Sequence, residues 1–271
     1  MKSIWQGKEN SKKVYDSKQF KTVILEQIIE LRFDKPPNEI FKILLSKIND
    51  ELSNINKINN NNIPPSIKEN GLNVFDSNEV KYSFIKKMNK NKSIIADEFC
   101  GSIMKETICN VCKIPEYHSE QYYYLDFKIG ENIEINNKDN KNLKINDYFD
   151  NFNNSYLEND KFMCKKCGKE RKAKVKKEIS VLSKTIIIYF DKNNFRNIDK
   201  IILEDNLKID NYSYSLISII VQFNNNFIAY CKNSLDTKWY RFKDETVTES
   251  SPKIVLSISR PLIVFLSRDE S

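Results

Sequence analysis

Two pairs of cysteines constrain the folding of this chain more than any other feature. Cys109 and Cys112 form one Cys-x-x-Cys pair, and Cys164 and Cys167 form a second. Two intervening residues let both thiolates of a pair face one ion, and two such pairs complete a tetrahedral four-cysteine shell. The segment between the pairs must therefore go out and come back, so that its two ends meet. We expect a structural Zn²⁺ site with no open position for water; the alternative is four unrelated buried thiols.

The overall composition excludes several classes of protein. With 271 residues, 40% of them hydrophobic and 11% aromatic, the chain can form a sizeable core and is not disordered throughout. No run approaches the ~20 apolar residues of a membrane span, and the first residues lack the apolar core of a signal peptide. We therefore expect an intracellular protein, cytoplasmic or nuclear, without a membrane partner, whose cysteines bind metal rather than form disulfides.

The spacing of apolar residues predicts helices first and a sheet afterwards. Residues 1–17 are polar and are expected to form a flexible arm. Helical spacing runs through residues 18–54, interrupted by Pro36 and Pro37, and a further helix is expected over 144–152. Asparagine-rich segments at 53–66 and 136–142 are expected to be surface loops. Short apolar runs predict strands, and hence the α+β class, at residues 122–127, 185–190, 215–223, 227–230, 239–242, 254–257 and 262–266.

A series of short motifs follows the chain in a fixed order. Phe99-Cys100-Gly101 precedes the first cysteine pair, Leu125-Asp126 follows it, and later motifs lie at 185–192, 214–216, 227–230, 239–242 and 261–265. In this order the motifs resemble those of the ubiquitin-specific protease family, over about residues 18–268. The resemblance implies a cysteine-peptidase-like hand with a reduced helical thumb, an antiparallel β palm and β fingers that carry a zinc ribbon. It divides a single domain into partial thumb helices with an insertion at 18–92, fingers at 93–185 and a palm at 186–268.

The positions at which this family carries its catalytic groups are altered. The cysteine nucleophile is expected in a Gly-Asn-x-Cys box upstream of Phe20, and no cysteine precedes that residue. The general base is expected in a Gly-His-Tyr motif, where this chain has Asn225-Asn226-Phe227. An amide such as that of Asn226 cannot accept a thiol proton at neutral pH. Lys243 replaces the orienting carboxylate, so the resemblance implies an inactive, N-terminally truncated member rather than an enzyme.

A relocated catalytic pair is the alternative to inactivity. His118 is the single histidine, and Cys100 and Cys231 are the thiols outside the two pairs. The resemblance places His118 on a finger, away from the palm, where a surface role or a contact near the metal is expected. An active ubiquitin thiol hydrolase would need these residues to meet, or a partner chain to supply the missing groups.

A basic run surrounds the second cysteine pair, in a chain whose net charge is +7. Such a run could contact an acidic partner or nucleic-acid phosphates. The plainer interpretation is a solvated strand edge, which the absence of interleaved aromatic residues favours. The candidate contact residues are Lys165, Lys166, Lys169, Arg171, Lys172 and Lys174.

The sequence supports one main functional hypothesis and two alternatives. The main hypothesis is a non-catalytic binding or scaffold module, because the fold signature is present and the chemistry is absent. Its partner would be ubiquitin, a ubiquitin-like protein or the subunits of a larger complex, including a ribonucleoprotein complex with RNA. The alternatives are the active thiol hydrolase described above and a nucleic-acid-binding zinc-ribbon protein, which salt-dependent binding would reveal.

Overall fold

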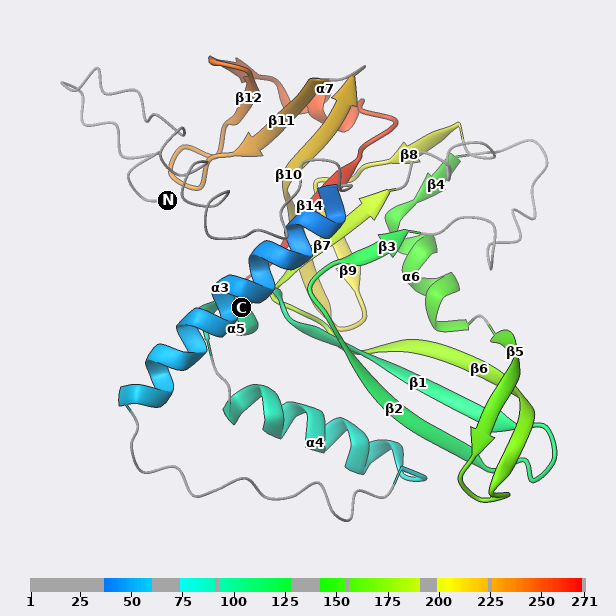
Figure 1. Cartoon of the computed structure of the whole chain (residues 1–271). Coiled ribbons are helices and arrows are strands. Elements are labelled where there is room, and N and C mark those ends of the chain that lie inside the picture. Colours follow the sequence, from blue (N-terminus) through cyan, green and yellow to red (C-terminus); the bar gives the residue numbers. More distant parts are fainter. Residues whose placement is uncertain are drawn as a thin grey trace.

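The computed structural model of this chain describes residues 37–59, 74–90, 93–127, 142–154, 156–190, 199–223 and 226–269. Two antiparallel sheets dominate these residues, and the smaller sheet projects away from the larger one (Figure 1). The predicted arm at 1–17, the predicted helix before Pro36, and residues 60–66 and 136–141 of the asparagine-rich segments lie outside the described residues. The loop predicted to begin at residue 53 is wrong for residues 53–59, which form the end of helix α3 (Pro37–Asn59). The asparagines outweighed Leu52, Ile55 and Ile58, which continue the apolar spacing of a helix. None of the helices among the described residues is long and apolar enough to cross a membrane.

The larger sheet, which we call the palm sheet, has the order β13-β12-β11-β10-β14-β7-β3, with β9 paired to β10. Its neighbouring strands are antiparallel, except that β3 runs parallel to β7. Four of the predicted palm strands are confirmed with small shifts at their ends, and the predicted strand over 185–190 has the observed bounds of β7. The strands are β3 (Leu125–Phe127), β7 (Thr185–Phe190), β9 (Asn206–Ile209), β10 (Tyr212–Phe223), β11 (Asn226–Lys232), β12 (Trp239–Lys243), β13 (Thr246–Ser250) and β14 (Ile263–Arg268).

The β7 strand is apolar throughout because both faces of the palm sheet are covered at this point. Ile186 and Ile188 lie in the main core, whereas Ile187 belongs to a second cluster with Leu45 of helix α3 (Pro37–Asn59). Helix α6 (Ile145–Asn154) closes the main core with Tyr148, whose ring centroid lies 4.4 Å from that of Phe127. The predicted helices over 144–152 and after the two prolines are therefore confirmed as α6 and α3.

The smaller sheet, which we call the finger sheet, has the order β2-β1-β6-β5 and is antiparallel. Helix α4 (Ser77–Lys90) packs against β1 and β2, and the short helix α5 (Ile94–Phe99) leads into β1. The strands are β1 (Gly101–Cys109), β2 (Pro115–Tyr122), β5 (Tyr156–Cys164) and β6 (Lys169–Val181), while β4 (Asn142–Lys144) and β8 (Lys200–Ile202) form a separate parallel pair. The two cysteine pairs thus lie at the β1–β2 and β5–β6 turns.

Two sequence predictions about strands are wrong. Residues 254–257 are not a strand, because α7 (Pro252–Leu256) is a helix. The Ser251 hydroxyl caps it by accepting a hydrogen bond from the Ile254 amide, and Pro252 occupies its first turn, where a missing N–H costs nothing. The strand predicted over 122–127 is interrupted by a bend at residues 123–124, so that β2 and β3 belong to different sheets.

Arg268 joins the end of the finger sheet to the palm sheet. Its guanidinium donates to the backbone carbonyl oxygens of Leu182 (2.6 Å) and Ser183 (3.1 Å), just after β6 ends. The same group donates to the Tyr214 hydroxyl at 3.1–3.2 Å and lies 4.0 Å from the centroid of the Tyr212 ring. One side chain therefore fixes the link between β6 and β7 against β10 and β14.

Replacing Arg268 by methionine, which keeps an unbranched side chain but removes the hydrogen-bond donors, is expected to lower the free energy of unfolding by about 2 kcal/mol. The loss arises because two carbonyl oxygens and a tyrosine hydroxyl lose a charged donor. Urea denaturation measures it. Arg241→Met is the matched control, since the Arg241 side chain on β12 donates to no backbone carbonyl among the described residues. Equal unfolding midpoints for the two variants would contradict the assigned role.

Candidate metal centre and the catalytic positions

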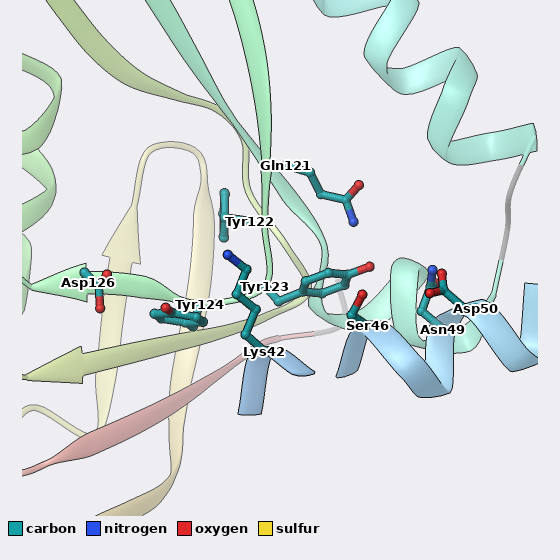
Figure 2. A pocket seen from close by; sticks show the side chains of 9 residues that line it. All are labelled: Lys42, Ser46, Asn49, Asp50, Gln121, Tyr122, Tyr123, Tyr124 and Asp126. Carbon is teal, nitrogen blue, oxygen red and sulfur yellow. The ribbon is translucent and has the colours of Figure 1, made fainter. Parts of the chain in front are cut away.

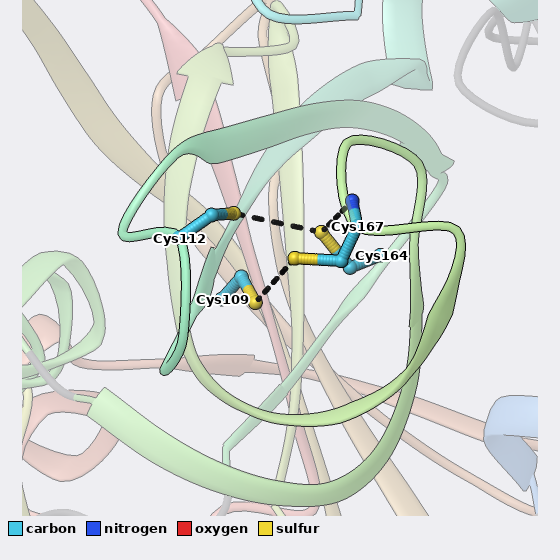
Figure 3. A group of neighbouring side chains, drawn as sticks. All are labelled: Cys109, Cys112, Cys164 and Cys167. Atoms are coloured by element: carbon cyan, nitrogen blue, oxygen red, sulfur yellow. Dashed lines mark hydrogen bonds between the residues drawn. The ribbon is translucent and has the colours of Figure 1, made fainter.

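The four paired cysteines come together at the far end of the finger sheet. Strand β1 ends at Cys109 and β5 ends at Cys164, while Cys112 and Cys167 lie in the turns that follow. All four sulfur atoms lie within 4.8 Å of one another. The Cys109 and Cys167 sulfurs are 3.9 Å apart, and those of Cys112 and Cys164 are 3.7 Å apart (Figure 3). The predicted meeting of the two pairs is thus observed.

These distances fit a tetrahedral metal ion. At a Zn–S bond length of about 2.3 Å, the corners of a tetrahedron are about 3.8 Å apart. A disulfide would instead require about 2.0 Å between two sulfurs, and all six cysteines are free thiols. The cluster therefore has the donor set and the spacing of a closed, four-thiolate metal site.

Backbone hydrogen bonds shape both turns around the sulfurs. The Val111 amide donates to the Cys109 sulfur at 3.4 Å, and the Cys167 amide donates to the Cys164 sulfur at 3.3 Å. The second turn closes at Gly168, whose φ of +63° is a left-handed conformation that favours glycine. Each of these amide hydrogen bonds stabilises the thiolate form of the sulfur that accepts it.

The thiols of the cluster do not ionise alike when no ion is bound. The backbone amide of Cys112 lowers the pKa of the Cys109 thiol to about 7. Burial raises the pKa of the Cys164 thiol to about 12. Since metal ligands must be thiolates, binding of an ion at neutral pH has to displace protons from this site.

Glu116 is a supporting residue that the sequence did not reveal. Its side chain is only 1% exposed, and its Oε1 atom accepts a hydrogen bond from the Lys165 amide at 2.7 Å. This bond attaches the second turn to β2. Nothing in the local sequence distinguishes Glu116 from the exposed glutamates, because its role depends on how β2 lies beside the β5–β6 turn.

His118 lies on β2 of the finger sheet, where the resemblance placed it. Burial, reinforced by the charge of Lys165, lowers the pKa of its imidazole. Within the residues that the structure describes, no hydrogen bond joins His118 to a cysteine. His118 therefore belongs to the sheet that carries the metal site.

Asn226 and Lys243, the two residues predicted to replace catalytic groups, lie on the palm sheet instead. Asn226 is the first residue of β11, exposed and paired with Phe223, and Lys243 is the last residue of β12, paired with Thr246. Cys231 lies inside β11, not after the strand, with its sulfur 3.2 Å from the Ser218 hydroxyl. Burial raises the pKa of the Cys231 thiol, and it raises that of Cys100 to about 12. Neither thiol is an activated thiolate.

An open polar pocket of about 440 Å³ lies between α3 and the link from β2 to β3. Figure 2 shows Lys42, Asn49 and Asp50 of α3 facing the tyrosines of that link. Its lining includes Asp126 but no cysteine and no histidine. The pocket can therefore bind polar groups but has no side chain suited to nucleophilic attack by a thiolate.

The predicted basic residues lie on the β5–β6 hairpin beside the metal cluster. All are exposed except Arg171, which is half-buried: Lys165, Lys166, Lys169, Arg171, Lys172 and Lys174. Lys165 and Lys166 lie in the turn, and the others lie along β6. The structure therefore places the basic residues in the second metal turn and along the strand that follows it.

The sequence profile of the ubiquitin carboxyl-terminal hydrolase family matches residues 1–266. The chain belongs to this family. The resemblance to ubiquitin-specific proteases is therefore confirmed, and the finger and palm sheets correspond to the hand-like fold that it implied.

Solved structures with this fold include SAGA modules. A chain of the SAGA Ubp8/Sgf11/Sus1/Sgf73 DUB module bound to ubiquitin aldehyde matches with a TM-score of 0.51 and 19% identity, over 71% of this chain and 47% of that one. The yeast SAGA module with a substituted Sgf73 matches with a TM-score of 0.52 and 20% identity, over 71% of this chain and 48% of that one. A module with variant Ubp8 and shortened Sgf11 matches with a TM-score of 0.62 and 15% identity, over 94% of this chain and 55% of that one. This member of the family thus shares their fold and spans about half the length of the matched chains.

Proposed function

We propose that this member of the ubiquitin carboxyl-terminal hydrolase family is a non-catalytic module that binds a protein partner. The proposal is carried by Asn226, which the order of the family motifs aligns with the general base. A side-chain amide has no basic lone pair at neutral pH and so cannot activate a thiol. Lys243, the last residue of β12, has the wrong charge to orient a histidine.

The remaining cysteines and the histidine support the same proposal. Four of the six cysteines form the metal cluster, and burial keeps Cys100 and Cys231 as thiols. The single histidine lies on the finger sheet, whereas Cys231 lies on the palm sheet. A general base must reach its nucleophile within hydrogen-bond distance, which this arrangement does not provide.

The proposed ion at the four-cysteine cluster is a structural Zn²⁺. Cys109, Cys112, Cys164 and Cys167 would hold it as thiolates, and it would stabilise the end of the finger sheet. Four sulfur ligands leave no position for a water molecule, so the site would contribute to folding and not to hydrolysis. The amide bonds to sulfur and the Glu116 contact would hold the turns in place around it.

We propose ubiquitin, a ubiquitin-like protein or a subunit of a larger complex as the partner. The fold is that of modules solved with ubiquitin aldehyde and with Sgf11, Sus1 and Sgf73. The open pocket between α3 and the β2–β3 link, with its tyrosines and charged residues, offers polar contacts to such a partner.

Two measurements test the proposal. Ubiquitin carrying a carboxyl-terminal fluorophore is expected to show no release above the buffer rate, with an active family member as the positive control. Release that disappears in Cys231→Ser or Cys100→Ser would overturn the non-catalytic assignment and identify a relocated nucleophile. Calorimetric titration with ubiquitin is expected to give saturable binding, and its absence at high concentration would exclude ubiquitin as the partner.

A further inference from the structure

The two metal turns present a small surface that nothing in the proposed function uses. Its six residues are all exposed: Val111, Lys113, Met163, Lys165, Lys166 and Lys169. We call this surface the fingertip. Val111 is 63% exposed and Met163 is 60% exposed. They are the sequence neighbours of Cys112 and Cys164, whose sulfurs lie 3.7 Å apart, so both side chains belong to the same end of the finger sheet.

The lysines of the fingertip differ from many others in the molecule. Lys184, Lys232 and Lys238 each lie within ion-pair distance of a carboxylate. In the described part of the chain, none of the four fingertip lysines has such a partner. The fingertip therefore combines two exposed aliphatic side chains with four positive charges that form no ion pair among the described residues. One exposed carboxylate, that of Glu170, lies beside it, directly across the hairpin from Met163.

The backbone beneath the fingertip is fixed. The Asn110 amide donates to the Lys172 carbonyl at 2.9 Å, which joins the first turn to β6. The Lys165 amide donates to buried Glu116, which joins the second turn to β2. Because both turns are held in this way, little backbone entropy is lost when a partner docks there.

We propose that the fingertip docks an acidic protein segment that carries an apolar side chain. The aliphatic pair would contact the apolar residue, and the surrounding lysines would attract its acidic neighbours. Single-stranded nucleic acid is the less suitable partner, because its bases stack on aromatic rings and the exposed apolar residues of the fingertip are aliphatic. This inference stands apart from the proposed function, since it concerns neither the palm positions nor the pocket.

The test uses a fluorescent peptide with two leucines flanked on each side by three glutamates, titrated into the full chain and followed by anisotropy. Val111→Ser with Met163→Ser is expected to weaken binding at least about tenfold. The double substitution Lys113→Glu with Lys169→Glu is also expected to weaken binding at least about tenfold; both lysines lie outside the two Cys-x-x-Cys segments. Added salt should weaken binding of the peptide to the parent chain. Zinc content and thermal melting of each variant show that the metal turns remain folded.

Matched substitutions elsewhere control for general effects of charge and exposure. Lys86→Glu with Lys87→Glu changes two exposed lysines of α4, and Leu235→Ser changes a leucine that is 71% exposed. Both are expected to leave peptide affinity within about twofold of the parent. The proposal is overturned if the peptide does not bind, or if the aliphatic substitutions leave binding unchanged. Binding of oligouridylate or of phosphatidylserine vesicles in place of the peptide would also overturn it.

Discussion

Replacement of Cys164 by serine is expected to release the metal ion and to destabilise the finger sheet more than any surface substitution. Cys164 is buried, and its sulfur lies 3.7 Å from that of Cys112. Serine cannot supply the thiolate that the ion needs, and structural zinc in small domains contributes on the order of 10 kcal/mol of binding free energy to folding. We expect about one zinc ion per parent chain by metal analysis, and a large fall in the melting temperature of the variant.

Cys231→Ser is the matched control for the metal site. It makes the same chemical change at a half-buried cysteine outside the cluster, whose neighbour is the Ser218 hydroxyl. This variant should retain its metal and melt within a few degrees of the parent. A chelator should reproduce the effect of Cys164→Ser in the parent chain. If the chelator leaves both the melting temperature and the metal content unchanged, the four cysteines do not hold a structural ion.

Replacement of Ile188 by alanine is expected to lower the free energy of unfolding by about 3–4 kcal/mol. Ile188 is fully buried in the middle of β7, with the main core on its face of the palm sheet. The substitution removes apolar contacts and leaves a cavity that the surrounding strands can only partly fill. Chemical denaturation followed by tryptophan fluorescence measures the change, because Trp239 belongs to the same core.

Ile94→Ala makes the same chemical change on the surface. Ile94 is 69% exposed at the start of α5, so its replacement should alter the free energy of unfolding by about 0.5 kcal/mol or less. A difference of under about 1 kcal/mol between the two variants would mean that β7 is less tightly packed than the structure indicates.

Local patterns in the sequence were enough to predict some elements and not others. The β7 strand was predictable because the short run of mostly apolar residues from Thr185 to Phe190 is typical of a strand that is covered on both faces. The metal cluster was predictable because Cys-x-x-Cys spacing determines where a pair of sulfurs can point. In contrast, the segment after Ser251 was misread as a strand, since its apolar residues outweighed the capping signal of Ser251-Pro252.

Features that depend on distant parts of the chain could not be read from the sequence. Glu116 supports the metal turns only because β2 passes beside the β5–β6 turn. The pocket forms where α3 meets the β2–β3 link, two segments well separated along the chain. The spacing of apolar residues along the sequence predicts neither of these contacts. The division of the domain at residues 92 and 185, and the roles of Asn226 and Lys243, stay predictions.

The position of β14 has a consequence for how the protein is made. This strand follows all the other palm strands in the sequence, yet it pairs with β10 on one side and β7 on the other. Before Ile263–Arg268 leaves the ribosome, β7 and β10 each expose an unpaired apolar edge. At about 5–20 residues synthesised per second, the nascent chain spends seconds in this state. The palm can therefore fold only after nearly all of the described chain has been synthesised, and until then it depends on protection from aggregation.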